Sequence, residues 1–134
     1  MEIIMRFVIA TLTVLLFSSA SGANEFSFTF DWGDIKKCTT GNPNRVANPI
    51  FTLVNVPEGT TEIKFRLTDL DVRSYNHGGG KVEYTGENVI QPGAFKYKSP
   101  CPPNGQHTYQ WKASLKDADG NKLGTAKAEK IYPE

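Results

Sequence analysis

Strict alternation of apolar and polar residues is the feature of this sequence that most limits its fold. Residues 26–32, 62–68 and 106–115 each place apolar side chains at every second position. A period of two is typical of half-buried β-strands, and no stretch of ten or more residues has the apolar spacing of an amphipathic helix. The sequence therefore predicts an all-β fold with few or no helices.

Turn-forming residues separate these segments from one another. The chain has 12 glycines and 8 prolines, a content that favours many turns. Weaker strands are expected at residues 50–56, 81–85 and 125–132. We expect loops at residues 36–49 and 86–105, and Asp119-Gly120 predicts a hairpin turn. Short strands joined in this way favour an antiparallel β-sandwich.

The core of such a sandwich is predicted at the in-phase apolar positions of the three strongest strands. These positions are Phe26, Phe28, Phe30, Ile63, Phe65, Leu67, Trp111 and Leu115.

The first 23 residues have the composition of a secretory signal peptide. Arg6 precedes an apolar run at residues 7–17, which is too short to span a bilayer, and small residues follow it. Cleavage is expected after Ala23, with cleavage after Ala20 or an uncleaved anchor as the alternatives. We therefore expect a periplasmic or secreted protein without a stable membrane anchor, whose mature part, residues 24–134, is a single β domain.

Two cysteines, Cys38 and Cys101, lie in the expected mature part. An even number of cysteines in an oxidising compartment suggests a bridge, and the spacing fits no redox or zinc motif. A Cys38–Cys101 disulfide is therefore predicted, and two unpaired buried thiols are the alternative.

The charge balance argues against one class of partner. The chain has 15 Lys and Arg against 14 Asp and Glu, a net charge of +1 with neutral histidines. This balance gives no electrostatic reason to expect nucleic acid as a partner.

Two carboxylates extend the apolar face of the strand at residues 62–68. If that strand stays regular, Asp69 and Asp71 share the face of Ile63, Phe65 and Leu67. Burying a charge is costly unless it is paired or hydrogen-bonded. The two residues should therefore meet partners or lie where the core opens to water, unless a bend turns both outward.

Two histidines and a tyrosine could join these carboxylates at one end of the sandwich. His107 begins the apolar face of its strand, Tyr109 follows on the same face, and His77 comes shortly after Asp71. The alternative for His107 is a satisfied core histidine. Residues 77–80 read His-Gly-Gly-Gly, a run found in the oxyanion hole of some lipases, but the Gly-x-Ser-x-Gly elbow of those enzymes is missing from the sequence. The glycines either turn backbone N–H groups toward a ligand or form a loop.

These residues lie in segments that resemble one known family. The segments are Val56-Pro57-Glu58-Gly59-Thr60, Asp69-Leu70-Asp71, His77, and Ser99-Pro100-Cys101-Pro102-Pro103-Asn104-Gly105-Gln106-His107-Thr108-Tyr109. Their order and rough spacing, from about residue 50 to 115, resemble the phosphatidylethanolamine-binding protein family, also called Raf kinase inhibitor protein-like. The small exported bacterial members look most similar.

The resemblance implies a β-sandwich with a small anion pocket lined by Asp69, Asp71, His77, His107 and Tyr109. Imidazole and phenol groups can donate hydrogen bonds to a phosphate-like oxyanion. Carboxylates beside them would fix a histidine tautomer. The sequence departs from the family pattern at residues 70–76, which lack its prolines and its tryptophan.

We therefore expect an exported, non-catalytic protein that binds a small anion or a phosphorylated headgroup, with no cofactor and no metal. No nucleophile–base set stands out that would indicate an enzyme. One alternative is a secreted interaction protein or enzyme inhibitor that uses residues 72–80 as a surface loop to bind a protein partner. Another is a carbohydrate-binding sandwich in which Trp32, Tyr75 and Tyr97 form an exposed stacking platform.

Overall fold

The computed structural model describes residues 24–134; the predicted signal peptide and its cleavage site after Ala23 lie outside the described residues. Over residues 24–134 the chain forms β-strands and no helix, which confirms the all-β prediction. Accordingly, this part of the chain has no helix that is long and apolar enough to cross a membrane.

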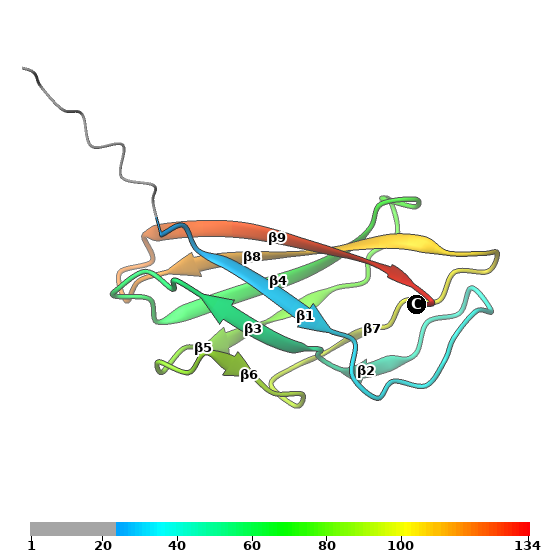
Figure 1. Ribbon diagram of the computed structural model, residues 1–134, viewed down its shortest axis with the longest axis horizontal. Helices are drawn as coiled ribbons and strands as arrows, with labels where there is room; N and C mark the ends of the chain where they lie inside the picture. Colours follow the sequence, from blue (N-terminus) through cyan, green and yellow to red (C-terminus); the bar gives the residue numbers. More distant parts are fainter. Residues whose placement is uncertain (1–23) are drawn as a thin grey trace, which may run out of the picture.

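The strands form three antiparallel sheets (Figure 1). The largest sheet has the order β5-β4-β8-β9, with β4 at Glu62–Asp69, β5 at Gly79–Glu83, β8 at His107–Lys116 and β9 at Lys122–Tyr132. The second has the order β1-β3-β6, with β1 at Ser27–Asp31, β3 at Ile50–Val54 and β6 at Val89–Ile90. A two-stranded sheet pairs β2, Arg45–Ala47, with β7, Lys96–Lys98.

The core lies between the two larger sheets. The ring of Phe51 on β3 lies 4.0 Å from that of Phe65 on β4 and 5.3 Å from that of Trp111 on β8, measured between centroids. All eight residues predicted for the core are buried. Buried and exposed residues alternate along β1 and β4, so the period of two in the sequence does mark the buried face of each sheet.

The structure differs from the expectation in the two long segments predicted as loops. Residues 36–49 contain β2, and residues 86–105 contain β6 and β7. These strands have only two or three residues, too few for an alternation to be visible in the sequence. The buried side chain of Asn48 connects the two segments, because its Oδ1 accepts N–H groups of residues 93–95 and its Nδ2 donates to the Gln91 carbonyl.

The predicted disulfide between Cys38 and Cys101 is present, with the two Cα atoms 4.6 Å apart. Both cysteines are buried, and such a bridge fits an exported protein. It fastens the segment before β2 to the proline-rich segment before β8. In Figure 1 these two segments and the connection after β4 lie at the same end of the molecule as the C-terminus.

Candidate functional site

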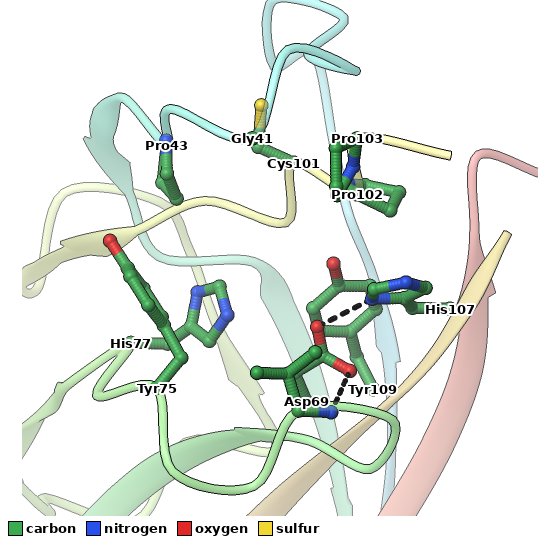
Figure 2. A pocket seen from close by; sticks show the side chains of 11 residues that line it. Gly41, Pro43, Asp69, Tyr75, His77, Cys101, Pro102, Pro103, His107 and Tyr109 are labelled. Carbon is green, nitrogen blue, oxygen red and sulfur yellow. Dashed lines mark hydrogen bonds and ion pairs between the residues drawn. The ribbon is translucent and has the colours of Figure 1, made fainter. Parts of the chain in front are cut away.

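A pocket of about 200 Å³ opens at this end of the molecule (Figure 2). Four of the predicted site residues line it: Asp69, His77, His107 and Tyr109. They come from the end of β4, the β4–β5 connection and the start of β8. The sheet register accounts for part of this convergence, because Asp69 lies directly opposite Tyr109 in the β4–β8 pair.

Asp69 is the buried carboxylate of the pocket, with 4% of the residue exposed. Its Oδ1 accepts the backbone N–H groups of Asp71 and Val72 at 2.9 and 3.2 Å. Its Oδ2 lies 2.7 Å from Nδ1 of His107. Three hydrogen bonds thus compensate the burial of this charge, as a buried carboxylate requires.

The contact with Asp69 determines which nitrogen of His107 faces the ligand space. A carboxylate accepts hydrogen bonds, so Nδ1 of His107 carries a hydrogen and donates it to Asp69. Nε2 is then the free nitrogen of the ring. When His107 is protonated, Nε2 also carries a hydrogen and can donate it to a bound anion.

Asp71 does not line the pocket, which differs from the expectation. The strand ends at Asp69 and the chain turns there, since the N–H of Val72 donates to the carbonyl of Asp69 at 3.2 Å. Asp71 is therefore exposed, and its Oδ2 accepts the backbone N–H of Thr108 at 2.8 Å. This bond fastens the turn after β4 to the residue next to His107, so Asp71 positions the site without facing its interior.

His77 is buried against the aromatic wall of the pocket. Its ring centroid lies 4.6 Å from that of Tyr75 and 5.5 Å from that of Tyr109. Nδ1 lies 2.8 Å from the carbonyl oxygen of Lys98 on β7, so Nδ1 carries a hydrogen and Nε2 accepts. Burial lowers the pKa of His77 below its usual value of 6.5, although the Lys98 carbonyl and the charge of Asp69 act in the opposite direction.

Tyr109 supplies a neutral hydroxyl to the pocket. Burial, and then the negative charge of Asp69, raise the pKa of Tyr109 above its usual value of 10.0. The phenol therefore keeps its hydrogen throughout the physiological range and remains a possible donor.

The remaining wall of the pocket is mostly apolar. Its residues are Gly41, Pro43, Val72, Tyr75, Cys101, Pro102 and Pro103. Figure 2 shows Pro43, Gly41 and the Cys101–Pro103 segment across the ligand space from Asp69 and the two histidines. The N–H of Cys38 donates to the hydroxyl of Tyr132 at 2.8 Å, so the disulfide and β9 both hold this wall.

Most of this wall cannot be predicted from the sequence. Residues 40–43 gave no signal beyond loop composition, and their placement depends on the disulfide that brings Cys38 to Cys101. From the sequence, Val72 is expected only in a surface loop, and Tyr75 in that loop or in the aromatic platform; both are exposed and line the pocket.

Packing explains two of the glycines that follow His77. A Cβ on Gly79 would lie 1.9 Å from the backbone oxygen of Phe65, and one on Gly80 would lie 2.4 Å from the ring of Phe95. Both glycines pair with β4 in the sheet. The close approach of β5 to its neighbours therefore requires them, and neither lines the pocket.

The stacking platform of Trp32, Tyr75 and Tyr97, which belongs to the carbohydrate-binding alternative, is not present. Trp32 and Tyr97 are buried, and only Tyr75 is exposed. Trp32 packs against Tyr109 and Tyr132, and Tyr97 packs against Trp111. This alternative is wrong because Trp32 continues the buried face of β1 and Tyr97 is the buried residue of β7, so both belong to the core.

One set of side chains in the described part of the chain has a spacing that could hold a metal ion. A ligand atom from each of Asp69, Asp71 and His107 lies within 4.8 Å of the other two. Each residue is already engaged, however, because His107 bonds to Asp69 and Asp71 bonds to the Thr108 amide. A metal ion held by Oδ2 of Asp69 and Nδ1 of His107 would have to break the bond between these two atoms.

Comparison with known proteins adds no assignment: no protein-family model matches the chain, and no curated protein matches it.

Proposed function

We propose that the protein is an exported, non-catalytic ligand-binding protein of the phosphatidylethanolamine-binding type, whose pocket takes a small anion or a phosphorylated headgroup. The observation that carries the proposal is the contact of 2.7 Å between Asp69 and His107 at the pocket. A carboxylate that accepts from one nitrogen of an imidazole fixes the orientation of the ring and leaves the other nitrogen free to bind a ligand.

The hydrogen-bonding groups of the pocket suit a phosphate group. His107 in its charged form and Tyr109 offer hydrogens to anionic oxygens, and charge-assisted bonds of this kind are the stronger ones. Nε2 of His77 accepts, so it can receive the hydrogen of a P–OH group or of an ammonium group. Since Asp69 already accepts three hydrogen bonds, its repulsion of the anion is reduced.

Calorimetric titration of inorganic phosphate and of phosphoethanolamine into the mature protein tests this proposal. His107→Ala should weaken phosphate binding by about 10- to 100-fold, because a charge-assisted hydrogen bond contributes roughly 1.5–3 kcal/mol. Gln106→Ala is the matched control, because Gln106 is the exposed neighbour of His107 and bonds to the carbonyl of Pro133. Equal affinity of the wild type and His107→Ala would remove His107 from the site.

A secreted interaction protein remains the second candidate. It is favoured by the exposure of Val72 and Tyr75, two large apolar side chains on the connection after β4. A folded wild type that binds no anion, together with a partner whose binding Tyr75→Ser abolishes, would support this function over the first.

A further inference from the structure

The outer face of the four-stranded sheet carries an excess of positive charge. Its charged side chains are seven cations, Lys64, Arg66, Lys81, Lys112, Lys116, Lys122 and Lys127, and three carboxylates, Glu62, Glu83 and Glu129. We call this surface the cationic face. Its excess of four positive charges contrasts with a net charge of only +1 for the whole chain, so the remaining residues sum to a net charge of −3.

The register places several of these cations directly opposite one another. Lys64 on β4 lies opposite Lys81 on β5, and Lys112 on β8 lies between Arg66 and Lys127. All five are exposed. The salt bridges formed among residues 24–134 join His107 to Asp69 and Lys130 to Glu134, so none of the five is neutralised there.

Such an arrangement reduces the stability of the free protein, because like charges opposite each other across two strands repel. An anionic partner would remove this repulsion. Three of the cations also line one depression of about 230 Å³, together with Asn76 and residues 78–80. The depression gives anionic groups a place to approach Lys64, Arg66 and Lys81 together.

We infer that the cationic face docks on a surface of anionic lipid headgroups. Neighbouring strands are about 4.8 Å apart, and alternate residues of one strand are about 7 Å apart, so the cations form a two-dimensional array. A headgroup layer offers negative charge under every row of such an array, whereas an extended polymer follows one row.

The composition of the face agrees with electrostatic docking on lipid. The positions in register with the five central cations are Gly79, Ser114 and Thr125, and no aromatic side chain stands among them to stack on a nucleic acid base. Ile131 is the exposed large apolar residue on this face. Binding should therefore depend on charge and fall steeply with ionic strength.

The test measures sedimentation of the mature protein with vesicles of phosphatidylglycerol and phosphatidylcholine in equal amounts. At low ionic strength the wild type should bind these vesicles and leave pure phosphatidylcholine vesicles unbound. Each cation near an anionic surface contributes about fivefold in affinity. Lys64→Gln/Lys112→Gln should therefore weaken binding about 25-fold.

Lys36→Gln/Lys37→Gln is the matched control, because it removes the same charge from exposed residues outside the sheets. This variant should bind the vesicles nearly as the wild type does.

Thermal unfolding gives a second readout. Lys112→Gln should raise the Tm at low ionic strength by about 1–4 °C, because it removes a cation with a cation on each side. A residue that only supported the fold would lower the Tm.

Several results would overturn the inference. The first is a wild type that does not bind anionic vesicles. The second is a control that loses as much binding as the Lys64/Lys112 variant. The third is binding of heparin without binding of vesicles, which would assign the face to an extended polyanion.

The cationic face shares no residue with the pocket. Phosphate titration of Lys64→Gln/Lys112→Gln should therefore match the wild type, so failure here and failure of the pocket proposal are distinguishable.

Discussion

At the scale of single residues, Asp69 is the side chain on which the pocket depends most. Its two oxygens connect the turn after β4 to the imidazole of His107. An asparagine in its place has one accepting oxygen and one donating nitrogen. It cannot satisfy two backbone N–H groups and an imidazole N–H with the same geometry.

We expect Asp69→Asn to weaken phosphate binding by about tenfold or more, even though it removes a negative charge from the pocket. The physical reason is that the charged imidazole of His107, the form that donates from Nε2 to the anion, loses the carboxylate that accepts from its Nδ1. Titration calorimetry measures the affinity, and nitrogen–proton NMR correlations of the imidazole report which of its two nitrogens carry a hydrogen. Asp119→Asn is the control, because Asp119 is an exposed carboxylate on the turn between β8 and β9 and does not line the pocket. Unchanged affinity in Asp69→Asn would show that His107 donates to the anion without the support of this carboxylate.

His77 should make the folded protein sensitive to acid. Its pKa is lowered by burial in the folded state and is about 6.5 in the unfolded chain. Below that value the unfolded chain takes up a proton that the folded protein resists, so the free energy of unfolding falls as the pH falls and levels off below the folded pKa.

Denaturant unfolding of the wild type and of His77→Gln, from about pH 7.5 to about pH 5, measures this effect. Glutamine can still donate to the Lys98 carbonyl but does not titrate. The wild type should lose more free energy of unfolding than the variant over this range. Parallel losses in the two proteins would contradict the assignment of a neutral, buried His77.

At the scale of strands, the approach of β5 to β4 is set by residues without side chains. Gly79 lies against the backbone of Phe65, whereas a Cβ on Gly124 of β9 would have no neighbouring atom closer than 4.0 Å. Gly79→Ala should therefore destabilise the protein by about 1–3 kcal/mol. Gly124→Ala should be neutral or stabilise it by up to about 1 kcal/mol. Chemical denaturation of both variants measures the difference, and equal effects would show that β5 can shift at no cost.

Strand parity predicted the site correctly as far as Asp69 and failed two residues later. The alternation at residues 62–68 predicted that Asp69 faces inward, and it does. Asp71 would share that face only in a continuing strand, but the chain turns after Asp69. This turn is stabilised by hydrogen bonds to the side chain of Asp69, and a turn of this kind leaves no periodic pattern in the sequence.

The wall at residues 40–43 could not be predicted for a different reason. Its position follows from a disulfide between cysteines 63 positions apart and from bonds to β9, and these long-range contacts leave no local pattern in the sequence. The pairing of the cysteines was predictable, whereas its consequence for the shape of the pocket was not.

At the scale of the whole molecule, one continuous aromatic cluster joins the two larger sheets. Phe65 is 1% exposed and contacts rings from three other strands: Phe28 on β1, Phe51 on β3 and Trp111 on β8. Its loss would therefore leave a cavity at the junction of the layers.

Phe65→Ala should lower the free energy of unfolding by about 3–5 kcal/mol, the cost typical of removing a buried phenylalanine ring. Val54→Ala is the control, because Val54 is 46% exposed on β3, and its effect should stay within about 0.5 kcal/mol. Urea denaturation measures both. A loss below about 1 kcal/mol for Phe65→Ala would mean that the sheets repack around the gap.

The disulfide also sets the stage of maturation at which the pocket is completed. Cys101 is itself part of the pocket wall, and Cys38 holds the loop that carries Gly41 and Pro43 on the opposite side of the bond. The strands and their aromatic core involve neither cysteine. A newly made chain can therefore form its sheets before oxidation, whereas the wall of its pocket is completed only once an oxidant has joined the two cysteines.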